Sequence, residues 1–446
     1  MDTPISDFVR KYCEKDILRL HMPGHKGNCV LGVEARDITE VEGADSLYEA
    51  NGIIKASEDN ASALFGCPTH YSAEGSSLCI RAMLYLALLH AKKRGKRPLI
   101  ATGRNAHKTF LSAVALLDLD VLWLAPEDPD SYLSCSLEPQ FLARTLDSAE
   151  EYPSALYLTS PDYLGHQADL AAISEVCRKR NILLLVDNAH GAYLRFLPQS
   201  QHPIDLGADL CCDSAHKTLP VLTGGAYLHI SPQADPMFTE QAKTALALFG
   251  STSPSYLILQ SLDEANLYLS QTYPSELAVF LPQVEKVKTA LTEHGYSLHG
   301  SEPLKITLAT KNYGYKGQEF AALLGAQNIS CEFADPDYVV MMLTPQIGIS
   351  GLNRLKEGLL SIQARAPITE APPPFSLPRR VMSVREAVLS PCQTIPVQDC
   401  VGQVLAASSV GCPPAVPIVM CGEMIQKEHL GVFSYYGISS CTVISK

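Results

Sequence analysis

The chain lacks the features that would direct it to a membrane or to nucleic acid. No uncharged apolar run among its 446 residues reaches membrane-spanning length, and residues 1–20 carry charges without the apolar core of a signal peptide. Positive charge is scarce, since the chain has 35 Lys and Arg against 47 Asp and Glu, and the longest basic run is the short segment 92–97. We therefore expect a soluble, cytoplasmic protein that binds neither membranes nor nucleic acid.

The sequence also lacks any CxxC motif, although it contains 14 cysteines. Their spacing is irregular, and Cys211 and Cys212 are neighbours in a predicted buried strand. This pattern favours small core residues of a reduced, intracellular protein over a disulfide framework. The sequence has no internal repeat, and its length predicts two or three domains, one of them large.

Helical and strand patterns alternate along the first two thirds of the chain. Predicted helices occupy residues 78–91, 107–117, 138–146 and 170–180. Between and after them lie predicted strands at residues 99–101, 121–124, 155–159, 182–186, 208–212 and 226–230. This alternation predicts an α/β fold with a mostly parallel sheet.

The remaining patterns predict the domain organisation. Helices are expected at 238–249 and 256–293, broken at Pro254, Pro274 and Pro282, and strands and helices of a second pattern follow from residue 305. A short helix at 383–389 and several strands near residues 412–417 follow a Pro-rich stretch. We predict an irregular N-terminal arm (1–60), a large domain (61–300), a small α+β domain (301–365), a linker (366–378) and a C-terminal domain (379–446).

An acid and a lysine follow two neighbouring predicted strands. Asp187 ends the apolar run 182–186, and Lys217 comes shortly after the run 208–212. Strand ends are where α/β sheets place their chemistry. Such a pair suits pyridoxal phosphate, because the lysine can form a Schiff base with its aldehyde and the acid can keep its pyridine nitrogen protonated. A simple ion pair would explain the two residues equally well.

Further stretches suit the same cofactor, each with a plainer alternative. Ser76 and Ser77 begin a helix after Gly75, where they could bind a phosphate or merely cap the helix. His107 follows a strand, where it could stack on a cofactor ring or be an ordinary loop residue. Ser214 and His216 lie at alternate positions just before Lys217, so both side chains could reach the cofactor from one short turn. Residues 250–256 are most simply explained as a turn followed by the start of a helix.

Together these stretches resemble a known family over nearly the whole chain. The sequence is similar to the bacterial ornithine/lysine/arginine decarboxylases of the aspartate-aminotransferase fold, in the short form without an N-terminal wing domain. The matching segments are His21-Met22-Pro23-Gly24-His25-Lys26-Gly27, 104–109, 187–191, Ser214-Ala215-His216-Lys217-Thr218, 252–256, Ser261-Leu262-Asp263 and 413–423. The resemblance implies a seven-stranded pyridoxal-phosphate fold of type I.

The resemblance implies roles for residues around the cofactor ring. Lys217 would form the Schiff base and Asp187 would hold the pyridinium nitrogen. His107 would stack on one face of the ring and Ala189 would pack on the other, with His190 near the phenolic oxygen. These roles are expectations that rest on the matching motifs.

The phosphate and the substrate would have their own partners. Ser76, Ser77 and Ser214 would bind the phosphate, with His216 close to it or to the substrate carboxylate. Thr252 would reach the phosphate of a neighbouring subunit, since the family builds its site at a dimer interface. We therefore expect a homodimer or a higher homo-oligomer.

Glu423 is our candidate for the distal cation of the substrate, because a cation in a closed site needs a carboxylate partner. A surface glutamate in a small domain is the alternative. The sequence departs from the family pattern in three places, at Glu74, Ala415 and Cys421. Glu74 should repel a nearby phosphate unless it points away, and the other two leave the shape of the substrate pocket open.

The resemblance implies pyridoxal-phosphate-dependent decarboxylation of arginine or lysine, and less readily ornithine, in polyamine biosynthesis. Two alternatives remain at this point. One is another reaction of the same fold, such as transamination or elimination. The other is a degenerate homologue with a binding role, for which the altered phosphate loop is the support.

Overall fold

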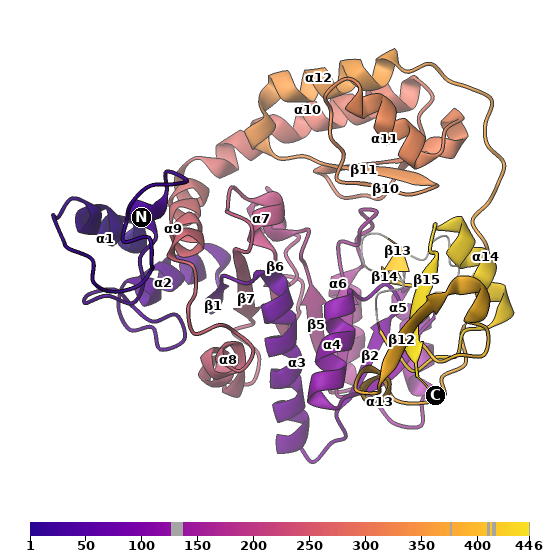
Figure 1. Ribbon diagram of the computed structural model, residues 1–446, viewed down its shortest axis with the longest axis horizontal. Coiled ribbons are helices and arrows are strands. Elements are labelled where there is room, and N and C mark those ends of the chain that lie inside the picture. The colour runs from indigo at the N-terminus through magenta and orange to yellow at the C-terminus, as the bar shows by residue number, and fades with distance from the viewer. Residues whose placement is uncertain (126–136, 375–376, 408–410, 413–415, 446) are drawn as a thin grey trace. The chain divides into compact units, whose positions relative to one another are not determined.

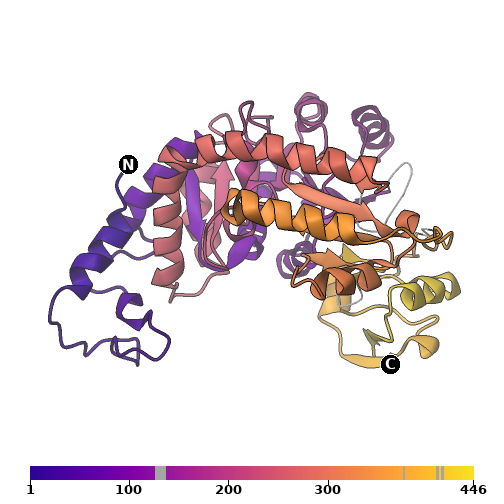
Figure 2. The same cartoon turned by 90° about the horizontal axis from the view of Figure 1, so that it is seen from above.

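The computed structural model describes residues 1–125, 137–374, 377–407, 411–412 and 416–445 (Figures 1 and 2). It divides into two compact units, each made of two chain segments. The first unit is Met1–Lys96 with Leu183–Ala278, and the second is Arg97–Ile182 with Val279–Lys446. Ala415 and residues 375–376 of the predicted linker lie outside the described residues.

The seven strands of the large sheet are distributed over both units. In the first unit the order is β1 (Thr69–Ser72), β7 (Ala226–Ile230), β6 (Leu210–Asp213) and β5 (Leu183–Asp187). In the second unit the order is β4 (Ala155–Thr159), β2 (Leu99–Gly103) and β3 (Asp120–Leu124). β5 runs parallel to β6, and β2 runs parallel to both β3 and β4, whereas β7 is antiparallel to its neighbours. The predicted α/β fold with a mostly parallel sheet is confirmed.

Burial explains why most residues of these strands are apolar. Every residue of β5, β6 and β7 is buried, as expected for a sheet covered on both faces. In the first unit α3 (Gly75–Lys93) packs against β6 and β7, and α8 (Met237–Ala247) packs against α3 (Figure 1). A polar residue at the end of such a strand is therefore held in a fixed position by backbone that is shielded from water.

An amphipathic helix replaces part of the predicted irregular arm. α1 (Pro4–Cys13) buries Ile5, Val9 and Tyr12, which recur at the i, i+4 and i+7 positions of one helical face. It contacts α2 (Ile53–Phe65) and α9 (Tyr256–Gln271). The prediction of irregular structure is wrong for residues 4–13 and also for residues 53–60, which belong to α2. The apolar spacing of residues 4–13 already indicates a helix.

Two of the three predicted helix breaks are present and one is absent. Pro254 lies between α8 and α9, as predicted. α9 ends at Gln271 and α10 (Tyr273–Glu293) begins two residues later, beside Pro274, as predicted. Pro282, however, lies inside α10, so the predicted break there is wrong. Proline costs a helix one hydrogen bond and adds a steric clash. Here the helix carries buried apolar side chains on both sides of the proline, including Phe280 and Val284, which stabilise it as one piece.

The second unit also holds a smaller antiparallel sheet. Its strand order is β10 (Phe333–Ala334), β11 (Tyr338–Met342), β9 (Lys305–Ala309) and β8 (Leu298–His299). α11 (Gly317–Gly325) packs against β10 and β11. The described part of this unit also contains most of α10 and the helices α4 (Lys108–Leu117), α5 (Pro139–Asp147), α6 (Leu170–Lys179) and α12 (Gly348–Ser361).

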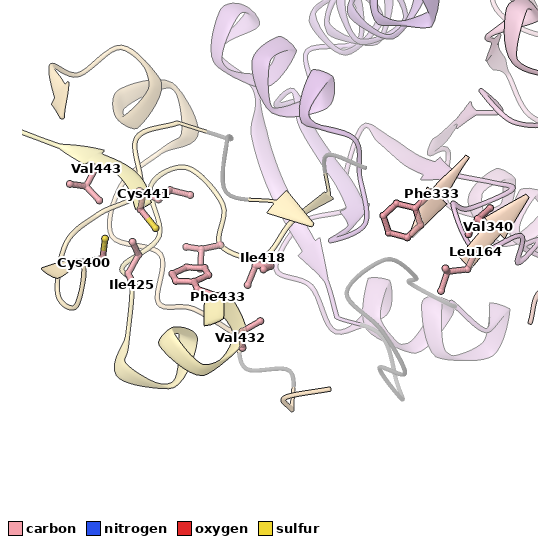
Figure 3. Packing of buried hydrophobic residues seen from close by; sticks show 12 residues of the cluster. Leu164, Phe333, Val340, Cys400, Ile418, Ile425, Val432, Phe433, Cys441 and Val443 are labelled. Carbon is pink, nitrogen blue, oxygen red and sulfur yellow. The ribbon is translucent and has the colours of Figure 1, made fainter. Parts of the chain in front are cut away.

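The C-terminal region contributes to a buried hydrophobic cluster that also contains Leu164, Phe333 and Val340 of the second unit. β12 (Cys392–Pro396) pairs with β15 (Ser440–Ile444), and β13 (Gly411–Cys412) pairs with β14 (Val416–Pro417). α14 (Lys427–Tyr435) supplies Val432 and Phe433 to this cluster, which also contains Ile418 and Ile425 (Figure 3). α13 (Val384–Val388), capped by Ser383, packs on α4. These contacts fix the segment that carries Glu423.

Short 3-10 helices complete the described structure: η1 (Glu34–Arg36), η2 (Ala192–Phe196), η3 (Thr310–Tyr313), η4 (Pro345–Ile347) and η5 (Val397–Asp399). Within the described residues, no helix is both long enough and apolar enough to cross a membrane.

Candidate active site

Asp187 is the last residue of β5 and is only 2% exposed. Its Oδ1 accepts a hydrogen bond from the backbone N–H of Ala189 at 3.2 Å and one from the Cys212 thiol at 3.7 Å. The parallel register places Asp187 opposite Cys212 of β6. The carboxylate is therefore held at the carboxyl end of a buried strand, as the sequence predicts.

Lys217 lies in the one-turn helix α7 (Ala215–Thr218), directly after β6. Its Nζ is 3.0 Å from Nε2 of His190, which is 4% exposed and only three residues beyond Asp187. The structure thus brings the lysine to the segment that begins with the buried acid. An amine in hydrogen-bond contact with an imidazole has a partner with which it can exchange a proton.

Two loops meet at the N-terminus of α3. Gly75 has a φ of +72° and donates its N–H to the carbonyl of Gly224 at 2.7 Å. Ser214 Oγ donates a hydrogen bond to Ser76 Oγ at 2.7 Å, and Ser77 follows in the same helical turn. Hydroxyls at the positive end of a 19-residue helix form an arrangement that can bind a phosphate.

Glu74, the first departure from the family pattern, has a definite partner. Its Oε1 accepts a hydrogen bond from the backbone N–H of Ser251 at 2.6 Å. The side chain therefore ties residue 251 to the loop that precedes α3. Thr252, next in the chain, is exposed.

His216 is oriented by the loop that enters β7. Its Nδ1 lies 3.0 Å from the carbonyl oxygen of Gly225, so this nitrogen carries the hydrogen and donates it. Burial lowers the pKa of His216, although the Gly225 carbonyl partly opposes this, and the charge of Lys217 lowers it further. The ring is therefore neutral at pH 7, with Nε2 as a hydrogen-bond acceptor.

His107 and Glu423 belong to the second unit, where each has local partners. His107 is the N-cap residue of α4, and its Nδ1 accepts a hydrogen bond from the backbone N–H of Thr109 at 3.2 Å. A neutral His107 with this contact carries its hydrogen on Nε2. The cap thus fixes both the ring orientation and its tautomer.

Glu423 is 3% exposed and forms a two-pronged ion pair with Arg104, which is 5% exposed. Nη1 and Nη2 of Arg104 lie 2.8 and 2.9 Å from Oε1 and Oε2. The backbone N–H of Met420 donates to Oε2 at 2.7 Å, and the guanidinium lies 5.6 Å from the centre of the Trp123 ring. Cys421, the departure beside it, is buried.

The ion pair between Arg104 and Glu423 is not predicted from the sequence. Arg104 directly follows β2, and this position at a strand end was the available signal. Its partner lies 319 residues further along the chain, so no local pattern could identify the pair. Asp213 ends β6 in the same way that Asp187 ends β5, and no role is predicted for it from the sequence.

The chain is similar to known proteins over most of its length. The family model described as "Orn/Lys/Arg decarboxylase, major domain" matches residues 3–294. The chain is 29% identical to the uncharacterised protein YaaO of Bacillus subtilis and 27% identical to the arginine decarboxylase of that organism, covering 96% of this chain and 93% and 92% of the relatives.

The fold is similar to that of lysine decarboxylases of known structure. The enzyme of Francisella novicida aligns with a TM-score of 0.80 at 15% identity, over 99% of this chain and 81% of that chain. The family match covers more than half of the chain, and the fold comparison is consistent with it. The chain therefore belongs to the Orn/Lys/Arg decarboxylase family, a family of pyridoxal-phosphate-dependent enzymes.

Proposed function

We propose that this protein removes the α-carboxylate of arginine or lysine, with ornithine as the third candidate, to yield the amine and CO2 for polyamine biosynthesis. The observation that carries this proposal is the contact of Lys217 with His190, in the segment that begins with the buried Asp187. The matched arginine decarboxylase of Bacillus subtilis supports a basic substrate.

The residues of the first unit fit pyridoxal phosphate. The cofactor needs an anion for its pyridinium nitrogen, an amine for its aldehyde and donors for its phosphate. Asp187 is a buried carboxylate, Lys217 supplies the amine, and Ser76 and Ser214 present hydroxyls at the start of α3. When bound, the cofactor would withdraw electrons from the substrate Cα and so permit loss of the carboxylate.

The protein would contribute orientation and proton handling. We assign to Asp187 the task of keeping a proton on the pyridine nitrogen, and to Ala189 and His107 the packing against the two faces of the ring. Lys217 would deliver a proton to Cα once CO2 has left, and His190 would adjust the protonation of the amine and lie near the phenolic oxygen. His216, whose Nδ1 is held by the Gly225 carbonyl, would assist at the phosphate or the substrate carboxylate. Ser77 would complete the phosphate site.

Glu423 remains our candidate for the distal cation of the substrate. Both of its oxygens already contact Arg104. A substrate ammonium or guanidinium would therefore have to share an oxygen with this pair or open it. Opening would leave Arg104 buried without its partner, which is costly unless another anion replaces it.

We further propose a homodimer, or a larger assembly of such dimers, with Thr252 reaching the phosphate of the neighbouring subunit. The support is the exposure of Thr252 together with large apolar side chains that reach solvent in the single chain. Leu18, Leu20, Val30 and Leu31 are each more than 80% exposed. Exposed apolar surface of this kind commonly marks a protein interface.

The deciding experiment incubates purified protein and pyridoxal phosphate with arginine, lysine and ornithine separately and identifies the amine and CO2 released. Release of agmatine or cadaverine, absent from the Lys217→Ala variant, is the expected result. Amino transfer to an added 2-oxo acid without CO2 would favour another reaction of the same fold. Failure to acquire the absorbance of the bound cofactor would favour a binding role without catalysis.

A further inference from the structure

A second buried acid lies beside the proposed cofactor site. Asp213 ends β6, and its side chain is fully buried. Its Oδ2 accepts hydrogen bonds from Nε2 of His202 at 3.2 Å and from Nε2 of His229 at 3.1 Å, and both imidazoles are also fully buried. Its Oδ1 accepts a hydrogen bond from the side-chain amide of Asn188 at 2.7 Å.

These donors keep the carboxylate ionised. Burial alone would raise the pKa of Asp213, but the two histidines outweigh burial and hold the pKa well below its ordinary value. Burial lowers the pKa of His229, although Asp213 partly opposes this. The network is thus a buried anion with hydrogen-bond donors at both of its oxygens, and a buried charge of this kind depends strongly on each of its partners.

Asn188 connects this network to the proposed catalytic residues. It lies between Asp187 and Ala189 in the chain, and its backbone N–H binds the carbonyl of Cys212 at 3.0 Å. A side chain at position 191 would place its Cβ 2.0 Å from Asn188 Oδ1, so Gly191 is required to make room for the amide. The side chain of Asn188 is therefore confined between Gly191 and Asp213.

We propose that Asp213 is a positioning residue, which, with His202 and His229, fixes Asn188 and thereby orients the Asp187 carboxylate. Asp213 also directly precedes Ser214, so the same anchor supports the hydroxyl that contacts Ser76. This inference rests on the proposed function of Asp187. It assigns to the fold a second carboxylate that never touches the cofactor and acts only through its neighbours.

A metal site is the competing interpretation of the same residues. One ligand atom each of His202, Cys211 and Asp213 lies within 4.8 Å of the others. However, Asp213 Oδ2 is at hydrogen-bond distance from two imidazole nitrogens, and the Cys211 thiol points its donor at Oδ1 at 3.7 Å. Burial raises the pKa of Cys211 well above its ordinary value, so the thiol stays protonated. These observations favour hydrogen bonds over metal ligation.

The test replaces Asp213 by asparagine, which keeps the shape and removes the charge. In the apoprotein, we expect faster amide hydrogen exchange in residues 187–191. In the reconstituted enzyme, we expect a shifted absorbance spectrum of bound pyridoxal phosphate and a kcat lowered about 10- to 100-fold with little change in KM, because small displacements of reacting groups have effects of this size.

The matched control is Asp263→Asn, which alters another fully buried acid of the same unit. Asp263 binds Ser57 Oγ and the backbone N–H of Ser6. We expect this control to leave the exchange of residues 187–191, the cofactor spectrum and kcat unchanged. If Asp213→Asn does not fold, Asn188→Ala and His202→Gln provide the same readouts with smaller disturbance of charge.

Three outcomes would overturn the inference. The first is that Asp213→Asn, or its substitutes, behave like the Asp263 control in exchange and spectrum. The second is that all of them lose every signal together with the fold while Asp263→Asn does not. The third is one equivalent of zinc that wild-type protein retains and Asp213→Asn loses. If wild-type protein binds no pyridoxal phosphate, the proposed function is refuted instead. The hydrogen-exchange measurement on the apoprotein would still test whether Asp213 holds residues 187–191 in place.

Discussion

Glu423 and Arg104 form a closed, two-pronged ion pair in the interior of the second unit, with nitrogen–oxygen distances of 2.8 and 2.9 Å. Each side chain is nearly inaccessible to solvent. The pair joins the residue after β2 to the C-terminal region, and Met420 adds a backbone hydrogen bond. Such a pair is costly to break from one side only, because the remaining charge stays buried.

Glu423→Gln should therefore destabilise the protein by about 3–5 kcal/mol, since it leaves the Arg104 charge without a compensating anion. The measurement is urea unfolding of the apoprotein. Glu319→Gln is the matched control, because Glu319 pairs with Arg365 on the surface and an exposed pair contributes about 1 kcal/mol or less. Equal, small effects of both substitutions would show that the buried pair is not a stabilising element.

Lys217→Ala should abolish turnover and the visible absorbance that a lysine-bound cofactor gives, while far-ultraviolet circular dichroism stays unchanged. Loss of a covalently acting residue commonly costs a factor of about 10⁴ or more. The check is the absorbance spectrum together with amine release. A variant that kept wild-type decarboxylation would remove Lys217 from the mechanism.

Asp187→Asn should lower kcat by about a hundredfold or more and weaken cofactor binding, because an amide cannot hold the positive charge of a pyridinium nitrogen. The neutral side chain has the same shape, so stability should change little. Steady-state kinetics and a cofactor titration measure the two effects. Unchanged kinetics would mean that another group supports the ring nitrogen.

Thr252→Glu should raise the dissociation constant of pyridoxal phosphate about tenfold or more, because it sets a carboxylate against the phosphate. If the residue acts across the dimer interface, mixing this variant with Lys217→Ala restores one intact site in each mixed dimer. Recovered activity after subunit exchange is the expected result. No recovery, despite confirmed mixed dimers, would place Thr252 in the site of its own subunit.

Asp263 should give stability a measurable pH dependence. Burial raises its pKa to about 6, against 3.8 for an ordinary Asp, so its contribution is greatest below pH 4 and is lost as the pH rises through 6. The difference amounts to about 3 kcal/mol at most. Wild type should therefore lose stability relative to Asp263→Asn between pH 4 and 7. A constant difference between the two unfolding free energies over this range would contradict the raised pKa.

The sequence by itself determined the elements and the strand ends that carry the chemistry. The continuous apolar run of β5 requires burial on both faces, and the acid that ends it must then lie at the edge of the sheet. The motif around Lys217 identified the family, which the family model confirms. The local spacing of apolar residues also indicates α1, in a segment for which we predict irregular structure.

Tertiary structure alone decided which polar groups meet. Ser214 and Ser76 lie 138 residues apart in the chain, Arg104 and Glu423 lie 319 apart, and neither pair has a local pattern. Pro282 likewise predicts a helix break from the sequence, but the tertiary packing of α10 keeps the helix continuous there. Periodicity reports which face of an element is buried, but the partner of a buried charge depends on how distant segments come together in the fold.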